Sequence, residues 1–322
     1  MRRATLIFNP NAGRCRDLAS LMPALVQVLA DHGLTSESAP TTGPGTAGTL
    51  ASQAAAAGTD IVFACGGDGT VHEVLQGLVG TTTALGIVPI GTANALARNL
   101  GISLDPIQAV AQQASVSPTR IAVGHISYTN ASSNVPSTRY FTVIAGAGPD
   151  GALVHSLLTG QKSSMGRTAY YAHAARLFVT RRFPPFRVSY RLQGSEQWHD
   201  EIVVSIMAAR ISNLGGIFSR LTPGASLYSS SLRLFLVRPP APISLPSWFL
   251  FGQLGMHRTN PRLRMLDVAE LRCEPLHPHQ PVHAQVDGEW IGSLPVSVKL
   301  IPDALSLLIP TPSREAHSRI KL

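Results

Sequence analysis

The chain has 322 residues, of which 44% are hydrophobic and 14% charged, and its formal net charge is +8. This composition is typical of a globular protein and excludes an intrinsically disordered one. No apolar stretch reaches the ~18–20 residues that span a bilayer, and the longest candidate, 243–256, is interrupted by Pro246. The apolar run after the first three residues is too short for a signal-peptide core, so we expect a cytoplasmic protein.

The basic balance of the chain, 26 Lys and Arg against 18 Asp and Glu, favours a partner with negative charge. Nucleic acid, an anionic lipid surface and a phosphorylated substrate all meet this description, and charge alone does not choose among them. The three cysteines, Cys15, Cys65 and Cys273, show no CxxC spacing. They indicate a reducing compartment and buried, unreactive thiols.

The first third of the chain alternates short apolar runs with helix-like stretches. The expected strands are 5–8, 60–65 and 85–88, and the expected helices are 17–31, 47–57, one after residue 69 and one from residue 93. Strands that alternate with helices imply a parallel sheet. We therefore predict an α/β domain over residues 1–120.

Beyond residue 120 the pattern changes to short strands separated by turns rich in proline and glycine. The expected strands are 120–127, 140–145, 186–192, 201–207, 232–237, 262–272, 282–286 and 295–301, with one helix at 164–180. This pattern predicts an antiparallel β-sandwich over residues 121–310. Residues 311–322 read as a polar, basic tail.

The most specific motif is Gly66-Gly67-Asp68-Gly69-Thr70, between an expected strand and an expected helix. Glycines at such a turn let backbone N–H groups approach an anion, and the helix N-terminus favours negative charge. A bare carboxylate is repelled by phosphates, so Asp68 is expected to face Mg²⁺ or a ribose hydroxyl. The motif predicts a phosphate-binding turn.

Two further polar turns follow expected strands, at 9–13 and at 89–94. In open α/β sheets ligands bind beyond the carboxyl ends of the strands. The three turns are therefore expected to converge on one site. By contrast, the Gly146-x-Gly148-x-x-Gly151 pattern lacks the acidic residue of a dinucleotide site and is interpreted as a structural turn.

These motifs resemble the diacylglycerol kinase catalytic family, in particular its bacterial lipid-kinase branch. The resemblance covers nearly the whole chain in the right order, through Asn9-Pro10-x-Ala12-Gly13, Gly66–Thr70 with Glu73, Pro89-x-Gly91-Thr92-x-Asn94, Gly166-x-x-x-Tyr170, Asn213 with Gly215-Gly216, and Asp287-Gly288-Glu289. It implies a nucleotide-binding α/β domain, a C-terminal β-sandwich and an active site in the cleft between them.

The same resemblance implies an ATP-dependent kinase that phosphorylates a lipid hydroxyl, with Mg²⁺ accompanying the nucleotide. It implies ATP, a membrane lipid and the anionic membrane surface as partners, with no nucleic acid, and leaves the lipid and the oligomeric state open. The residues expected to bind ATP are Asn9, Pro10, Asn11, Ala12, Gly13, Thr41, Gly66, Gly67, Asp68, Gly69, Thr70, Val71, His72, Gly91, Thr92 and Asn94.

The acidic pair Asp287 and Glu289 flanks a glycine late in the chain. Phosphoryl transfer to an alcohol needs an acceptor for the hydroxyl proton, and a carboxylate can serve. The family resemblance implies this role for the motif. The sequence does not decide which of the two carboxylates is the base.

The chain departs from the family's pattern at Ser229-Ser230, where an Asp-Gly pair that helps bind a structural Mg²⁺ is usual. Serine hydroxyls are weak ligands for a hard cation. The sequence therefore predicts little dependence on a structural metal. A second departure, His72 in place of Asn, is expected to be tolerated because both side chains can hydrogen-bond near a phosphate.

Two segments mix aromatic with basic or apolar residues and are candidates for membrane contact, 181–187 and 248–251. An alternative for the second segment is packing inside the protein. Two other functions remain open at this stage: an NAD kinase, which shares the Gly-Gly-Asp-Gly turn, and a nucleotide-binding regulator with weakened catalysis.

Overall fold

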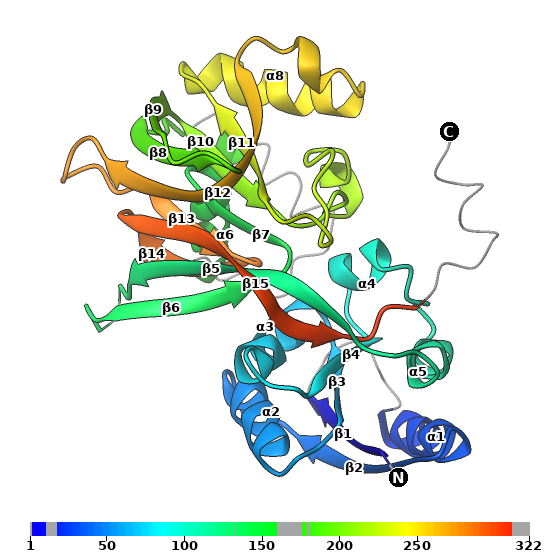
Figure 1. The fold of residues 1–322 in the computed structure, drawn as a ribbon. Helices are drawn as coiled ribbons and strands as arrows, with labels where there is room; N and C mark the ends of the chain where they lie inside the picture. The colour runs from blue at the N-terminus through cyan, green and yellow to red at the C-terminus, as the bar shows by residue number, and fades with distance from the viewer. Residues whose placement is uncertain (1, 11–17, 132, 160–175, 179–180, 311–322) are drawn as a thin grey trace. The chain divides into compact units, whose positions relative to one another are not determined.

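The computed structural model describes residues 2–10, 18–131, 133–159, 176–178 and 181–310 (Figure 1). The expected helix at 164–180 and the expected tail at 311–322 lie outside these residues, apart from 176–178, which are helical. No helix among the described residues is long and apolar enough to cross a bilayer.

The chain divides into two compact units. Unit 1 comprises Met1–Val123 with Pro302–Leu322, and unit 2 comprises Gly124–Ile301. The sequence assigned residues 302–310 to the second domain. The division by compactness places them in unit 1, because the end of one long strand pairs there with the parallel sheet.

Unit 1 is built on a parallel sheet with the strand order β15-β4-β3-β1-β2 (Figure 1). Its strands are β1 (Arg2–Phe8), β2 (Leu34–Pro40), β3 (Ile61–Gly66), β4 (Ala84–Pro89) and the end of β15 (Val296–Leu307). Its helices are α1 (Leu18–Asp31), α2 (Thr46–Ala56), α3 (Asp68–Leu78), α4 (Ala95–Asn99) and α5 (Pro106–Ala114).

Helices cover both faces of this sheet, as the continuous apolar sequences of β3 and β4 require. One core joins α1 and α5 to alternate residues of the strands, including Leu25, Leu6 and Phe63. Helices α2 and α3 pack against each other on the opposite face, where α2 contacts β1 and α3 contacts β3. Because successive side chains of a strand point to opposite faces, a strand buried on both sides has no polar alternation.

A buried glutamine extends the pairing of β4 near its carboxyl end. The Gln113 side chain accepts a hydrogen bond from Ile87 N at 2.8 Å and donates one to Ile87 O at 2.7 Å. It therefore completes the hydrogen bonding of Ile87, which lies beyond the two β4 residues that pair with β15. This contact ties α5 to the strand that leads into the 89–94 turn.

Unit 2 is built from strands whose neighbours pair antiparallel. The strands are β5 (Thr119–Thr129), which begins in unit 1, β6 (Pro136–Phe141), β7 (Ile144–Ala147), β8 (Phe186–Leu192), β9 (Trp198–Val203), β10 (Ser205–Ala209), β11 (Leu232–Val237), β12 (Leu263–Pro275), β13 (His283–Val286), β14 (Glu289–Ser293) and the start of β15. The described helices are α6 (Pro149–Thr159) and α8 (Ala241–Gln253), with short 3₁₀ turns at Gly216–Phe218 and His257–Thr259.

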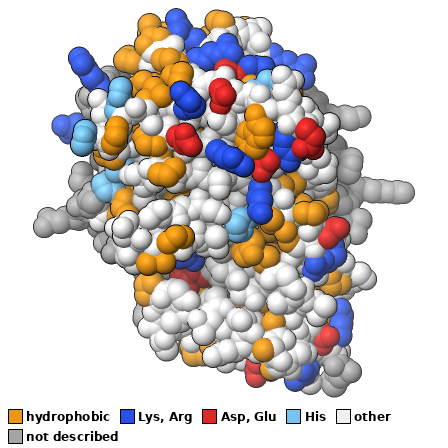
Figure 2. Space-filling model, turned by 60° about the vertical axis from the view of Figure 1, so that its left-hand side comes forward, with side chains coloured by type: hydrophobic (Ala, Val, Ile, Leu, Met, Phe, Trp, Pro, Cys, Tyr) orange, Lys and Arg blue, Asp and Glu red, His pale blue; other side chains and the backbone are white. Residues whose placement is uncertain are grey.

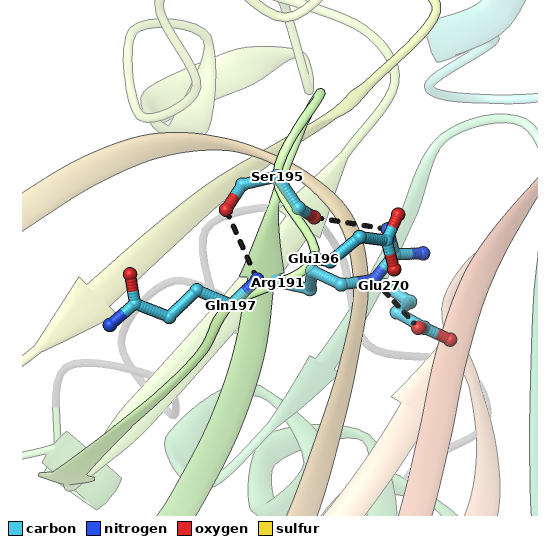
Figure 3. A network of polar contacts seen from close by, with 5 residues as sticks. All are labelled: Arg191, Ser195, Glu196, Gln197 and Glu270. Atoms are coloured by element: carbon cyan, nitrogen blue, oxygen red, sulfur yellow. Dashed lines mark hydrogen bonds and ion pairs between the residues drawn. The ribbon is translucent and has the colours of Figure 1, made fainter.

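Two hydrophobic clusters form the interior of unit 2: one includes Phe141, Phe186 and Leu234, and the other includes Phe235 and Trp248. The β8–β9 turn is fixed at its base by Arg191, which Figure 3 shows bonded to the Ser195 carbonyl and the carboxylates of Glu196 and Glu270. Glu196 is 96% exposed, so its ion pair contributes little. The pair with Glu270 of β12 is the one that joins two elements of the sheet.

Several elements differ from the sequence-based expectations. The sequence did not predict β2, α5, α6 or α8. The expected strand 140–145 is two strands, β6 and β7, and the expected strand 201–207 is also two, β9 and β10. Continuous apolar sequence concealed both breaks, since such a run carries no signal of where pairing stops.

Candidate active site

Two glycine-containing turns of unit 1 lie in contact at the carboxyl ends of β3 and β4. A Cβ atom placed on Gly91 would lie 2.4 Å from Gly67 Cα, which no real side chain permits. Glycine at both positions therefore lets the two backbones touch. The first predicted turn is described only at Asn9 and Pro10, because residues 11–17 lie outside the described part of the chain.

The Asp68 carboxylate joins the first of these turns to the helix that follows the second. Its Oδ1 atom accepts a hydrogen bond from Ala95 N, the first residue of α4, at 2.7 Å. Asp68 is partly exposed at the start of α3. The carboxylate thus stabilises the conformation of the loop, in addition to any role towards a ligand. The sequence did not predict this structural role.

The 89–94 turn is shaped by Asn94, which has a left-handed backbone with φ 48°. Its side chain accepts from Gly91 N at 3.1 Å and donates to Gly91 O at 3.0 Å. Because the amide is engaged with the turn itself and the residue is buried, Asn94 stabilises the loop. Thr92 beside it is exposed.

Other predicted nucleotide residues differ in their surroundings. Thr41 donates its N–H to Phe8 O at 2.8 Å, so it lies at the carboxyl end of β1. Val71 and His72 are buried within α3. Glu73 accepts from Ala47 N at 3.2 Å, at the first turn of α2. A nucleotide contact from Val71 or His72 stays a prediction.

The acidic turn of unit 2 connects β13 and β14. Asp287 and Gly288 both have positive φ, 46° and 86°, as in the two-residue turns that suit a β-hairpin. Gly288 N donates to the buried side chain of Gln285 at 2.9 Å. A side chain of β13 therefore holds the turn in this geometry.

The Asp287 carboxylate accepts three backbone hydrogen bonds. They come from Thr142 N at 3.1 Å, Val143 N at 3.0 Å and Ile144 N at 2.8 Å, and Asp287 N donates to Ile144 O at 2.9 Å. These are the residues at which the expected strand 140–145 breaks. The carboxylate takes the place of a neighbouring strand for the interrupted peptide units.

Glu289 stands at the start of β14, two residues beyond Asp287, and is partly exposed. The two carboxylates thus differ in their surroundings: that of Asp287 accepts hydrogen bonds from a loop, whereas Glu289 lies at the rim of the hairpin. This difference was not visible in the sequence, because the donors lie far away in the chain.

Helix α6 packs against β13, the first strand of the hairpin. A Cβ atom on Gly151 would lie 2.3 Å from His283 O, so α6 approaches β13 at backbone distance. The His155 and His283 rings stack with centroids 4.2 Å apart. The glycine pattern at 146–151 was interpreted as a structural turn, and close packing of α6 on β13 is its physical reason.

Asp150, the second residue of α6, links this helix to the acidic turn. Its Oδ2 atom accepts from Gln285 Nε2 at 3.0 Å, and Gln285 in turn accepts from Gly288 N. The Oδ1 atom is buried with no hydrogen bond among the described residues. Burial raises the pKa of the Asp150 carboxyl to about 6, against the hydrogen bonds from Gln285 and the backbone.

A buried guanidinium occupies the neighbourhood of Ser229. Arg210 is 0% exposed and follows β10. It donates to Ser229 O at 2.9 Å, Ser231 O at 2.8 Å and Leu227 O at 2.6 Å. Burial lowers its pKa to about 10, so it remains protonated at neutral pH.

The family's structural Mg²⁺ site, which the sequence already put in doubt, does not fit these residues. The loop carbonyls that a cation could bind already accept from Arg210, whose positive charge would repel a second cation. No group of three or more His, Cys, Asp or Glu residues suited to a metal occurs within the described ranges.

Comparisons with known proteins agree with this architecture. A family model for the diacylglycerol kinase catalytic domain matches residues 3–126, and one for the YegS C-terminal NAD kinase beta sandwich-like domain matches residues 143–309. The diacylglycerol kinase of Bacillus subtilis (strain 168) is 26% identical over 298 residues, which cover 92% of this chain and 92% of that protein.

Two solved structures share the fold. The crystal structure of a diacylglycerol kinase from Bacillus anthracis str. Sterne has a TM-score of 0.73 at 20% identity and covers 97% of each chain. Yeast NADH kinase complexed with NADH has a TM-score of 0.50 at 10% identity, over 100% of this chain and 87% of that chain. The predicted combination of a parallel α/β domain with a β-sandwich is confirmed.

The raised pKa of Asp150 predicts how the free energy of unfolding depends on pH. An unfolded aspartate titrates near ~3.9, so between about pH 4 and 6 the folded state binds the extra proton. This group's contribution is present at low pH and is lost as the pH rises through about 6. In the wild type this loss should lower the free energy of unfolding by about 2–3 kcal/mol as the pH rises. Asp150→Asn should abolish that fall, which urea unfolding at several pH values measures.

The matched control for this prediction is Asp31→Asn, which changes an exposed carboxylate of α1. Its curve of unfolding free energy against pH should run parallel to that of the wild type. If the Asp150→Asn curve also runs parallel to the wild type, the Asp150 carboxyl is not desolvated as described.

Proposed function

Since this chain belongs to the diacylglycerol kinase catalytic family, we propose that it transfers the γ-phosphoryl group of ATP to the free hydroxyl of a diacylglycerol-like lipid. The family resemblance inferred from the sequence is confirmed, as is its classification as an ATP-dependent kinase. The likeness to yeast NADH kinase is one of fold alone, so it does not favour the NAD kinase alternative. The observation that carries the proposal is the contact of Gly67 with Gly91, which joins two turns beside Asp68.

ATP is proposed to bind at the carboxyl ends of the unit 1 strands. Gly69, which has open space beside its backbone, and the exposed Thr92 belong to the two turns in contact. The N–H groups at the start of α3 favour an anion there. Thr41 lies at the end of the neighbouring β1. Residues 9–13 complete the proposed site on the strength of the family resemblance.

Mg²⁺ is proposed to enter with the nucleotide. Among the described residues the turns supply one carboxylate, that of Asp68, and Mg²⁺ in kinases is bound by one or two carboxylates together with substrate phosphates. The partly exposed Asp68 suits this role while its Oδ1 atom holds Ala95 N. Bound there, the metal would neutralise charge on the transferred phosphoryl group.

Glu289 is proposed to be the general base and Asp287 a positioning residue. The Asp287 carboxylate accepts three backbone hydrogen bonds, so both of its oxygens are engaged in holding the 142–144 segment. Glu289 is on the same rigid turn and is partly exposed. The lipid hydroxyl oxygen attacks the γ-phosphorus, the bond to the ADP oxygen breaks, and the hydroxyl proton passes to Glu289.

Arg210 is proposed to replace the structural cation of the family. Its guanidinium satisfies three carbonyls of the 227–231 loop, and its own N–H donates to Val143 O at 2.9 Å. Val143 N in turn donates to Asp287. One residue thus binds the 227–231 loop through its charged side chain and the segment that holds the acidic turn through its backbone, with no metal required.

The roles of the two carboxylates can be separated by kinetics. Glu289→Gln removes the proton acceptor, so kcat for lipid phosphorylation should fall about 100-fold or more while ATP affinity is retained. Asp287→Asn places an NH2 group against at least one of the N–H groups of 142–144, so it should cost about 1–3 kcal/mol of stability and lower kcat less than Glu289→Gln does.

The control is Glu196→Gln, which alters a fully exposed carboxylate of unit 2 and should leave the kinetics unchanged. A fall in kcat of about 100-fold in Asp287→Asn, with near-normal turnover in Glu289→Gln, would reverse the assignment. Normal turnover in both variants would remove the acidic turn from the mechanism.

The role of Arg210 predicts that EDTA leaves the melting temperature of the nucleotide-free protein unchanged, although turnover still requires Mg²⁺ with ATP. Arg210→Met leaves buried carbonyls without donors and should destabilise unit 2 by about 3 kcal/mol or more. Arg187→Met, at an exposed position of β8, is the matched control and should cost little. A marked drop in melting temperature with EDTA would establish a structural metal and overturn this role.

A further inference from the structure

Helix α8 has an unusual exposed face. Its 13 residues include no charged side chain, whereas a surface helix normally turns polar residues to solvent. Ile243 is 56% and Leu250 58% exposed. The exposed residues of the helix are all apolar: Pro242, Ile243, Pro246, Phe249 and Leu250.

The opposite face of α8 is packed into unit 2. Trp248 is 6% exposed and stacks on Phe235 of β11, with ring centroids 6.3 Å apart and planes at 18°. Ala241 and Leu245 belong to the same core cluster. The helix is therefore anchored by one apolar face and presents a second one outward. This arrangement divides the 248–251 segment: Trp248 packs inside, while Phe249 and Leu250 do not.

The outward face continues beyond the helix. Leu254 is 62% and Met256 47% exposed. Gln253 donates to Ile217 O at 2.6 Å, which brings the half-exposed Ile217 alongside. We call the whole surface the α8 patch, made of Ile217, Pro242, Ile243, Pro246, Phe249, Leu250, Leu254 and Met256. Contiguous exposed apolar surface of this kind marks an interaction site.

Basic residues stand at both ends of the α8 patch. Arg220 donates to Gln253 O at 2.8 Å at the end of the helix, and the exposed Arg258 follows shortly after. Arg262 donates to Pro239 O at 3.1 Å, just before the helix begins. Of the seven arginines in residues 202–266, Arg210 is buried and three form ion pairs with Glu201 or Asp267, which leaves Arg220, Arg258 and Arg262 beside the patch. Figure 2 shows hydrophobic and basic side chains gathered at the top of the view, the end that carries α8 in Figure 1.

We propose that the α8 patch docks the protein on an anionic phospholipid bilayer, with the apolar face entering the interface and the arginines contacting phosphate headgroups. The choice of partner rests on the proposed function, because a lipid substrate lies in such a bilayer. Apolar side chains combined with flanking arginines are what interfacial binding uses.

The other candidate segment, 181–187, is less suited to insertion. Its aromatic residues Phe183 and Phe186 are buried, and its exposed side chains are those of the arginines. A second copy of the chain also suits the α8 patch less well. Two copies meeting through it would bring arginines of like charge together, which disfavours association.

Vesicle sedimentation tests the proposal directly. The wild type should bind vesicles of equal phosphatidylcholine and phosphatidylglycerol more tightly than vesicles of phosphatidylcholine alone, and the difference should shrink with salt. Ile243→Gln with Leu250→Gln should weaken binding to the mixed vesicles by about tenfold or more. Arg258→Gln should weaken it by about fivefold and leave binding to neutral vesicles unchanged.

The matched control is Leu104→Gln with Val135→Gln, which replaces two apolar residues that are 41% and 53% exposed elsewhere. It should bind mixed vesicles as the wild type does. Equal binding by the α8 variant and the wild type would overturn the proposal. So would a wild-type dimer that the α8 variant converts to a monomer in sedimentation velocity, since the patch would then be a contact between copies.

Phosphorylation of a short-chain diacylglycerol in detergent micelles separates this proposal from the proposed function. The α8 variant should keep the wild-type rate there, because no bilayer is needed. Loss of micellar activity with unchanged vesicle binding would place the patch in the substrate site and overturn the docking role. Vesicle binding that depends on α8 in a protein without lipid kinase activity would support docking and contradict the proposed function.

Discussion

The proposed chemistry depends on one interaction: the Asp287 carboxylate accepts hydrogen bonds from three backbone N–H groups. Thr142 and Val143 lie between β6 and β7, and Ile144 begins β7. One ionised side chain supplies acceptors for their N–H groups and in doing so fixes the turn that carries Glu289. Because charge-assisted hydrogen bonds are stronger than neutral ones, the turn is held without a large interface.

Two buried residues extend this support, Gln285 through its side chain and Arg210 through its backbone N–H. Gln285 connects the turn to Asp150 of α6, and Arg210 reaches the same segment through Val143 while satisfying the 227–231 loop. Each link places a polar or charged group where desolvation is costly, which is reflected in the raised pKa of Asp150 and the lowered pKa of Arg210. The hydrogen bonds of this network rigidify the site, although Asp150 Oδ1 has no hydrogen bond among the described residues. A rigid second unit is what a positioned base requires.

The parts that the sequence predicted well are those with local signals. The strand–glycine–helix pattern of Gly66–Thr70 marked the β3–α3 turn, and Pro89–Asn94 marked its neighbour, because the end of a strand and the start of a helix are signalled by adjacent residues. The parts that it missed depend on partners distant in the chain. The sequence could not show that Asp287 accepts hydrogen bonds from residues 142–144, that Asp68 accepts one from Ala95, or that Arg210 donates to the carbonyls of the 227–231 loop. Helix α8 escaped notice because an apolar helix with two prolines has no amphipathic period.

The most direct measurement of the central claim is transfer of label from γ-labelled ATP to extracted lipids, resolved by chromatography. The wild type should label a lipid with a free hydroxyl, whereas a regulator with weakened catalysis would bind ATP and label none. Asp68→Asn keeps an oxygen that can accept from Ala95 N but removes the negative charge, so it should remain folded and transfer almost no label. Wild-type transfer by a folded Asp68→Asn protein, or the absence of any labelled lipid with the wild type, would contradict the account.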